Sequence, residues 1–225
     1  DKEQDLQNFR QKKEIERLNK LKEHERNKVL FQEESERFLN NAYDRYKDRL
    51  NKMNNEQRMK NLSVPSGKID VVLDTDAYNE IDDQFAISYM IKSKEKIHVT
   101  AICAAPSYNA HSESPKDGME KSYDEVLKLL SLMRENVDVF KGSEKYLDDE
   151  KKPIISDASK MLAELSNEYS PENPLYVVAI GAITNVASAL LLNPEMKNNV
   201  VVVWLGGHAQ HFHDTKEFNM KQDVA

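Results

Sequence analysis

From residue 68 onward the sequence alternates short apolar runs with amphipathic stretches, and this alternation constrains the fold more than any other feature. Mostly apolar strands separated by helices are typical of a parallel sheet covered on both faces. We therefore predict an α/β fold with an open, mostly parallel sheet. The predicted strands lie near residues 69–74, 97–103, 137–140, 175–180 and 200–205, and the predicted helices near 82–92, 118–134, 157–169 and 184–192.

Residues 1–62 have a different composition and contain no proline or glycine. Glu, Lys, Arg, Gln and Asn dominate this segment, which favours helix throughout. Its sparse apolar residues include a run spaced by three or four, as in a coiled-coil seam, at Leu39, Ala42, Tyr46, Leu50 and Met53. We predict a long charged α-helical, coiled-coil extension that packs against a partner chain, a second copy or the domain. A solvated extension with fluctuating helicity is the alternative.

The first proline and glycine of the chain lie in residues 63–67, which we interpret as a linker. An α/β domain is predicted to follow over residues 68–225. Residues 1–62 carry 16 Lys+Arg against 13 Asp+Glu, a net charge of +3, and residues 63–225 carry 16 against 26, a net charge of −10. The acidic balance of the domain argues against a nucleic-acid partner.

The single cysteine, Cys103, lies in an apolar run and is expected to be a small buried hydrophobic residue. No disulfide can form within the chain. No apolar stretch approaches the roughly 18 residues that a membrane span needs. The cellular location stays open, with the cytoplasm favoured.

Five acidic side chains follow the first predicted strand within ten positions: Asp74, Asp76, Glu80, Asp82 and Asp83. Ligands of open α/β sheets bind at the carboxyl ends of the strands, where this turn lies. Carboxylates this close repel one another, and a hard divalent cation relieves the repulsion. The alternative is that Asp82 and Asp83 only complement the positive end of a helix dipole and that Asp74 is a turn residue.

Asp74-Thr-Asp76 followed by Asp82-Asp83 resembles the amino-terminal signature of the nucleoside hydrolases, Asp-x-Asp-x-Gly-x-Asp-Asp. The turn is two residues longer and lacks the glycine, which resembles a divergent branch of that family. Two further segments add to the resemblance, so that it covers about residues 65–225. Residues 174–187 resemble the family's Gly-Pro-Leu-Thr-Asn-Leu-Ala segment, and residues 206–219 carry its Gly-Gly and Glu-Phe-Asn.

The resemblance implies metal-dependent hydrolysis of the N-glycosidic bond of ribonucleosides to ribose and free base, in purine or pyrimidine nucleoside metabolism. It implies Ca²⁺, more than Mg²⁺, as the cofactor. Asp76 would be the general base, and the metal ligands would be Asp76, Asp83 and the main-chain carbonyl of Thr184. Asp74 would orient the other carboxylates. The ribonucleoside would be bound by Asp82, Asn109, Glu217 and Asn219. Thr184 or Asn185 is also a natural N-cap of the helix that follows.

The carboxy-terminal part of the resembled family keeps a second function open. Members of the resembled family continue well past Glu-Phe-Asn, and a later aspartate completes their calcium shell, so this domain is expected to lack its carboxy-terminal part. The alternative is therefore a catalytically incomplete domain that acts as a structural component of an assembly through its amino-terminal helix.

Two enzyme classes with similar side chains fit less well. A haloacid-dehalogenase-like phosphatase also uses Asp-x-Asp at a strand end, but it has no use for Asp82-Asp83 or for Glu-Phe-Asn. His208, His211, His213 and Asp214 would suit zinc or iron, although their spacing matches no defined motif for either metal.

Overall fold

The computed structural model describes residues 54–209, 211–214 and 216–225. The chain divides into two compact units, residues 1–52 and 53–225, and the account below concerns the second. The predicted seam from Leu39 to Met53 lies outside the described residues. Within the described residues, no helix is long and apolar enough to cross a membrane.

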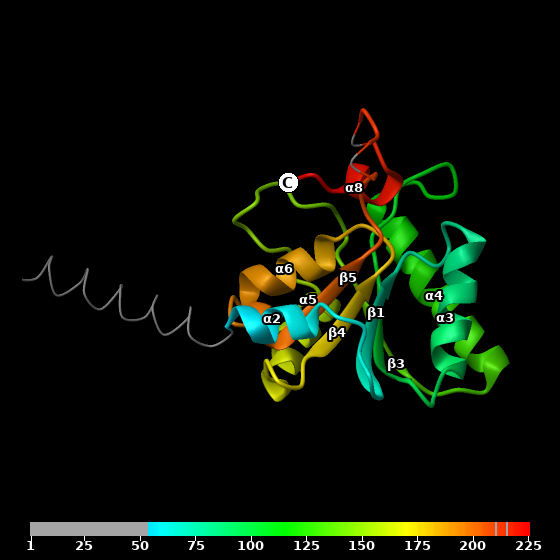
Figure 1. Cartoon of the computed structure of the whole chain (residues 1–225). Coiled ribbons are helices and arrows are strands. Elements are labelled where there is room, and N and C mark those ends of the chain that lie inside the picture. Colours follow the sequence, from blue (N-terminus) through cyan, green and yellow to red (C-terminus); the bar gives the residue numbers. More distant parts are fainter. Residues whose placement is uncertain (1–53, 210, 215) are drawn as a thin grey trace, which may run out of the picture. The chain divides into compact units, whose positions relative to one another are not determined.

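Five strands form one sheet in the order β3-β2-β1-β4-β5, and every pair of neighbours is parallel (Figure 1). The α/β prediction is confirmed, and the sheet is entirely parallel where a mostly parallel one was predicted. The strands are β1 (Ile69–Thr75), β2 (Ile97–Ala104), β3 (Asp138–Lys141), β4 (Leu175–Ala179) and β5 (Val200–Trp204).

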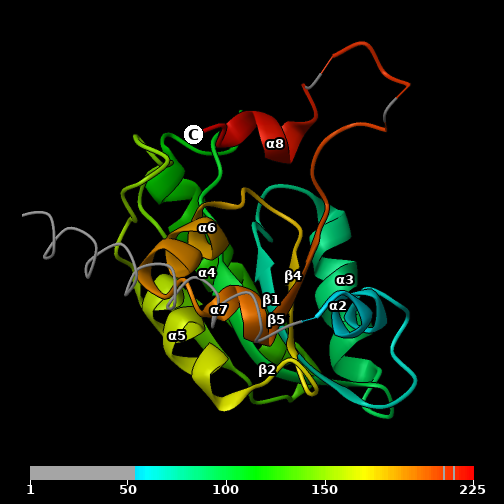
Figure 2. The ribbon, with the colours of Figure 1, turned by 60° about the vertical axis from the view of Figure 1, so that its left-hand side comes forward.

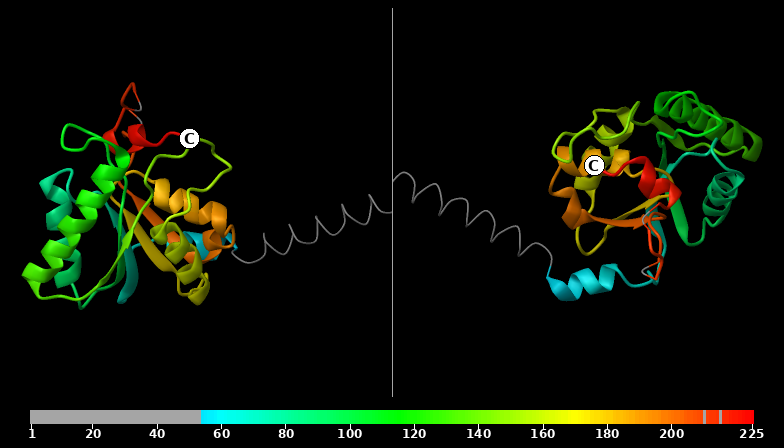
Figure 3. Two further views of the ribbon diagram at one scale, coloured as in Figure 1. Left: turned by 180° about the vertical axis from the view of Figure 1, so that it is seen from behind. Right: turned by 90° about the horizontal axis from the view of Figure 1, so that it is seen from above.

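Helices cover both faces of the sheet, as the apolar strands require. The longer helices are α3 (Ile81–Lys92), α4 (Pro115–Met133), α5 (Asp157–Leu165) and α6 (Thr184–Leu192). The short ones are α2 (Asn55–Asn61), the 3₁₀ turn η1 (Ser166–Glu168), α7 (Met196–Asn199) and α8 (Phe218–Gln222). Helices α3 and α4 lie on one face, and α5, α6 and α7 lie on the other (Figure 3).

Two apolar clusters follow from this layering. Residues on alternate sides of β1, such as Val71 and Val72, enter different clusters because successive strand side chains point to opposite faces. Val71 packs with Ile87 of α3, whereas Val72 packs with Leu162 of α5. All four side chains are at most 1% exposed, so β1 is the buried centre of the domain.

Helix ends differ from the predicted ranges where capping chemistry decides them. Helix α4 begins three residues earlier than predicted, because Ser114 caps it by accepting from the Asp117 amide and Pro115 occupies the first turn. Helix α5 begins at residue 157 as predicted, after Ser156, which forms a capping box with Ser159, but it ends at Leu165, four residues before the predicted end. Helices α7 and α8 were not predicted, since each is too short for an apolar period to show.

The short helix α2 lies within the predicted extension and contacts the α/β domain. The side-chain amides of Gln57 and Asn61 both donate to the Pro171 carbonyl, at 3.0 and 2.8 Å. Asn54 caps this helix by accepting from the Gln57 amide. These bonds attach residues 54–61 to the loop that precedes β4.

The order of the strands places a topological switch point between β1 and β4. These strands are neighbours in the sheet, yet the chain visits β2 and β3 on one side of β1 before it returns to β4 on the other. The chain therefore leaves β1 toward α3 on one face and β4 toward α6 on the other, and ligands of open α/β sheets bind outside the carboxyl ends of the strands at such a point. Helix α8 lies over this carboxyl edge of the sheet (Figures 1 and 2).

Candidate active site

The acidic turn that follows β1 separates into buried and exposed carboxylates. Asp74 and Asp76 at the end of the strand are buried, as is Asp83 in the first turn of α3. Asp83 Oδ1 accepts a hydrogen bond of 2.5 Å from the buried Thr75 hydroxyl, which ties the helix start to the strand end. Asp82 is exposed. The structure thus brings three of the predicted carboxylates together in the interior and leaves Asp82 on the rim.

The turn between β4 and α6 packs against the Asp76 carboxylate. A Cβ atom built at Gly181 would lie 3.0 Å from Asp76 Oδ1 and 3.0 Å from the Ala105 Cβ. Only a residue without a side chain fits there unless its neighbours move. The carboxyl ends of β1, β2 and β4 therefore meet at Gly181.

Asn185 joins three strand ends in the interior. Its Nδ2 donates to Asp74 Oδ1 at 2.8 Å and to the Ala104 carbonyl at 3.1 Å. Its Oδ1 accepts from the backbone N–H and the hydroxyl of Ser143, at 2.8 and 3.0 Å. Asn185 is fully buried, and all of its hydrogen-bonding groups are used across the site.

The prediction that Thr184 or Asn185 caps helix α6 is wrong. The N-cap is Ile183, and no side chain caps the helix. The Thr184 hydroxyl donates instead to Asp223 Oδ2. Side chains suited to capping are used here to connect the helix start with distant loops.

Sequence reasoning missed Gln222, the last residue of α8, and Asp223, which follows it. Gln222 Oε1 accepts from the Tyr146 hydroxyl and from the Tyr108 amide, the latter at 2.8 Å. Asp223 Oδ2 accepts from the Leu147 amide at 3.1 Å, in addition to the Thr184 hydroxyl. The signal in the sequence was weak, because one amide and one carboxylate near the end of the chain form no recognised motif.

Buried polar atoms without a partner gather at this site. The described residues contain four such side-chain atoms: Oδ2 of Asp74, Oδ2 of Asp76, Oγ1 of Thr100 and Nε2 of Gln222. Three of the four belong to residues at the carboxyl end of the sheet. An unpaired buried polar group costs free energy, so unpaired groups at one place indicate a site built for a ligand.

The buried carboxylates have raised pKa values. Burial raises the pKa of Asp76 to about 8, and the nearby charge of Asp83 adds to the rise. Burial raises the pKa of Asp74 to about 7 and that of Asp83 to about 6, although hydrogen bonds from Asn185 and Thr75 oppose the two shifts. Positive charge at this site would restore the ionised forms at neutral pH.

Asn109 lies near the acidic turn. Its Nδ2 donates to the side-chain oxygen of Asn79, and the Asn79 amide donates to the Asp76 carbonyl at 2.7 Å. Asn109 Oδ1 accepts from the His111 amide at 2.7 Å. The loop after β2 is thus linked to the turn after β1, as expected for strand ends that meet at one edge.

Glu217 and Asn219 lie at the start of α8 and make structural contacts. The two Glu217 oxygens accept from three backbone N–H groups, of Gly207, Asn219 and Met220, at 2.8 to 3.0 Å, so Glu217 caps the helix. Asn219 Nδ2 donates to the carbonyls of Ile180 and Leu205, at 3.1 and 2.9 Å. These bonds attach α8 to the ends of β4 and β5.

The donor set fits a hard cation. No group of three or more His, Cys, Asp and Glu side chains within the described residues could hold a metal ion. The ligand set expected from the sequence would not form such a group, because it combines the carboxylates of Asp76 and Asp83 with the main-chain carbonyl of Thr184. All of these donors are oxygens, and Asp76 Oδ2 has no protein partner. Ca²⁺ prefers such ligands.

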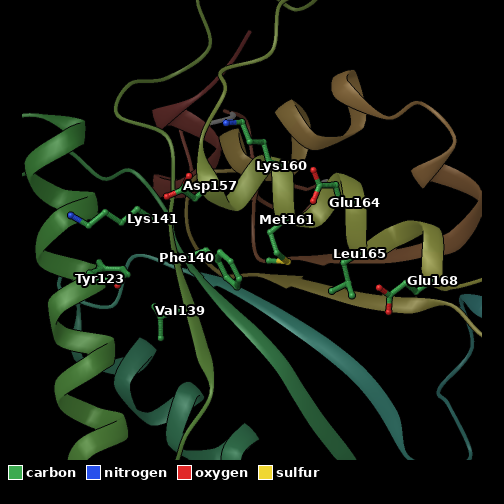
Figure 4. A pocket seen from close by; sticks show the side chains of 10 residues that line it. All are labelled: Tyr123, Val139, Phe140, Lys141, Asp157, Lys160, Met161, Glu164, Leu165 and Glu168. Carbon is green, nitrogen blue, oxygen red and sulfur yellow. The ribbon is translucent and has the colours of Figure 1, made fainter.

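Two other features lie apart from the acidic turn. A cavity of about 650 Å³ lies between α4 and α5 beside the edge strand β3, and Lys141, Lys160 and Asp157 are among its lining residues (Figure 4). His208 stacks on Phe212 with ring centroids 4.9 Å apart, and its Nε2 lies 3.4 Å from Asp214 Oδ1. Among the described residues, the loop that carries His208, His211 and His213 forms no metal-binding group.

Comparison with known proteins identifies the family of the α/β domain. The model of the inosine-uridine preferring nucleoside hydrolase family matches residues 71–225, well over half of the chain. The chain belongs to this nucleoside hydrolase family. No curated protein matches it.

Solved structures show the same fold. A purine-preferring ribonucleoside hydrolase from Gardnerella vaginalis superposes with a TM-score of 0.55 at 24% identity, over 69% of this chain and 55% of the other. A plant nucleoside hydrolase superposes with a TM-score of 0.53 at 25% identity, over 71% of this chain and 55% of the other. An inosine-guanosine nucleoside hydrolase superposes with a TM-score of 0.53 at 22% identity, over 68% of this chain and 55% of the other. The chain thus covers about half the length of these relatives.

Proposed function

We propose that this member of the nucleoside hydrolase family hydrolyses the N-glycosidic bond of ribonucleosides to ribose and free base, with Ca²⁺ bound. The observation that carries the proposal is the set of buried, unpartnered carboxylate oxygens at the switch point of the sheet. Unpaired oxygens in the interior cost free energy, and a ligand that binds them offsets this cost. Because the chain belongs to the nucleoside hydrolase family, we take this ligand to be a calcium ion.

In this proposal each carboxylate has a separate task. Asp76 takes the proton from the attacking water as general base, while Asp83 and the Thr184 carbonyl help to hold the cation. A bound divalent cation supplies positive charge that lowers the pKa of a bound water. The raised pKa of Asp76 to about 8 shows why this matters: without compensating charge the base would hold its own proton at neutral pH.

The remaining expected residues would hold the ribose. Asp82 is exposed on the rim of the acidic turn, and Asn109 is linked to that turn through Asn79. The Asn219 side chain uses its Nδ2 for the bonds to Ile180 and Leu205, and its carbonyl oxygen could therefore accept from a sugar hydroxyl. Glu217 would have to share its oxygens between the helix cap and a sugar hydroxyl. We propose that residues 1–62, for which the sequence predicts a helical extension, attach the enzyme to a partner helix or a second copy.

A ribose-release assay on the full-length protein tests this function. Inosine, uridine, adenosine, guanosine and cytidine are incubated with and without a calcium chelator. We expect ribose release that the chelator abolishes and a loss of at least 100-fold in kcat/KM for Asp83→Ala. The matched control Asp124→Ala removes an exposed carboxylate from α4 and should keep full activity. Chelator-resistant activity, or full activity in Asp83→Ala, would refute the assigned metal role.

One observation favours a second candidate, a catalytically incomplete domain that serves as a component of an assembly. The described residues contain no group of three or more His, Cys, Asp and Glu side chains that could hold a metal ion. The assay separates the candidates when calorimetry with Ca²⁺ and ribose is added. If the domain is a component of an assembly, we expect no ribose release from any nucleoside and no calcium binding.

A further inference from the structure

We infer that Asp223 is a positioning residue of the candidate active site, acting through Thr184. The inference rests on the proposed function, since it assigns Thr184 to the cation site. The supporting feature is the α8 clamp, which we define as Gln222 and Asp223. This clamp holds three loops of the carboxyl edge at once.

The first contact of the clamp is buried. Thr184 is fully buried and Asp223 is 7% exposed, and the Thr184 hydroxyl donates to Asp223 Oδ2. A hydrogen bond to a charged acceptor is roughly twice as strong as a neutral one. Because α6 has no side-chain cap, this bond replaces the local contact that would otherwise fix the first residue of the helix.

The second contact joins the same carboxylate to a different loop. Asp223 Oδ2 also accepts from the Leu147 amide at 3.1 Å, so a single oxygen holds the loop after β4 against the loop after β3. Gln222 makes the matching connection between the loops after β2 and β3, through the Tyr108 amide and the Tyr146 hydroxyl. Two adjacent residues thus fix three strand-end loops relative to one another.

The clamp lies next to the reacting carboxylate. Burial raises the pKa of the Tyr146 phenol most, and the charges of Asp76 and Asp223 add to the rise, so Tyr146, whose hydroxyl donates to Gln222, is near both carboxylates. Gly181, three residues before Thr184, packs on Asp76 Oδ1. A shift of the Thr184 segment would therefore move the surroundings of Asp76.

A double-mutant cycle with Ca²⁺ calorimetry tests the inference on the full chain. Thr184→Val removes the hydroxyl and keeps the main-chain carbonyl, and Asp223→Ala removes the acceptor. We expect each to weaken Ca²⁺ binding about tenfold, the low end of the range for partners that orient metal ligands. The double variant should lose no more than Asp223→Ala alone, because the bond that Thr184→Val breaks is one of the two that Asp223→Ala breaks. Thr184→Ser keeps the hydroxyl and should bind within twofold of the wild type.

Controls and a second readout make the outcome unambiguous. Asp124→Ala removes an exposed carboxylate and should leave binding unchanged. Wild-type affinity in Asp223→Ala, or a double variant near 100-fold, would overturn the inference. If Asp223→Ala does not fold, Asp223→Leu, which has a similar volume and no acceptor, takes its place in the cycle.

Amide hydrogen exchange separates failure of the inference from failure of the proposed function. It is measured at residue 184 and at Leu147 without metal. Exchange at residue 184 should be faster in Thr184→Val and in Asp223→Ala, and exchange at Leu147 should be faster in Asp223→Ala, which removes its acceptor. Both rates should be unchanged in Thr184→Ser. If the wild type binds no Ca²⁺, the proposed function fails, and accelerated exchange still supports the positioning role. Unchanged exchange in Asp223→Ala would end that role, whether or not the wild type binds calcium.

Discussion

At the scale of single residues, the site depends on side chains that take no part in the proposed reaction but hold the carboxylates in place. Asn185 is the clearest case, since it bonds to Asp74, to a β2 carbonyl and to Ser143 from a fully buried position. Each of these partners is itself buried. Removing Asn185 would leave several polar groups unpaired in the interior, which is among the costliest single changes a fold can undergo.

We predict that Asn185→Ala lowers the free energy of unfolding by about 3 kcal/mol. The reason is the loss of partners for Asp74 and for the Ser143 amide, which water cannot reach without rearrangement. Urea denaturation measures the change. Asn136→Ala, an exposed amide, is the control and should change the free energy by less than about 0.5 kcal/mol. A loss below about 1 kcal/mol for Asn185→Ala would contradict the role assigned to it.

At the scale of elements, the turn between β4 and α6 sets the space around Asp76. Gly181 has ordinary backbone angles, so close packing explains the glycine here. Helix α8 contributes from the other side, because its cap Glu217 and Asn219 attach it to the ends of β4 and β5. Both elements act on the site through contacts between segments that are distant in the sequence.

Gly181→Ala should reduce catalysis more than stability. Its new Cβ would lie 3.0 Å from Asp76 Oδ1 and 3.2 Å from Asp76 Cγ, so the carboxylate has to move. A misplacement of about 1 Å can cost about 100-fold in kcat/KM, so a shift of a few tenths of an ångström at a general base should cost a measurable part of that. Gly67→Ala is the matched control, since nothing lies within 4 Å of its Cβ position. Equal activity of the two variants would show that Asp76 does not need its present position.

At the scale of the whole molecule, the domain places three buried carboxylates where the two halves of its sheet diverge. The pKa values of Asp74, Asp76 and Asp83 are about 7, 8 and 6 in the folded state, against 3.8 as the ordinary value. Between about pH 4 and 8 the folded chain therefore binds more protons at these groups than the unfolded chain does. The folded state without a cation must become less stable as the pH rises through this window.

We predict that, in the presence of a chelator, the melting temperature falls between pH 5 and pH 8. The contribution of these carboxyls is most favourable near the acidic end, where they hold protons, and is lost as they ionise in the interior. Saturating Ca²⁺ should raise the melting temperature more at pH 8 than at pH 5, because binding requires the ionised forms. Circular dichroism with and without chelator measures both effects.

Asp76→Asn provides the control for this pH dependence. The amide removes the carboxyl with the highest of the three pKa values, so the fall between pH 7 and pH 8 should become shallower. Half-buried carboxylates with lowered pKa values, such as Asp117 and Glu135, bond to lysines at the surface and contribute little to the change between pH 5 and pH 8. A melting temperature that rises steadily to pH 8 with chelator would contradict the assignment.

The sequence alone determined the fold class, the positions of the five strands and the acidic turn, because apolar periodicity and charge are local properties of the chain. It also identified the family through three separated motifs. Only the tertiary structure decided that Asp82 is exposed while Asp76 and Asp83 are buried, since burial depends on what packs on a turn. The same holds for Asn185, Gln222 and Asp223, whose partners lie on other strand ends. Their roles arise from contacts between segments up to 114 positions apart, as between Tyr108 and Gln222, which no local pattern encodes.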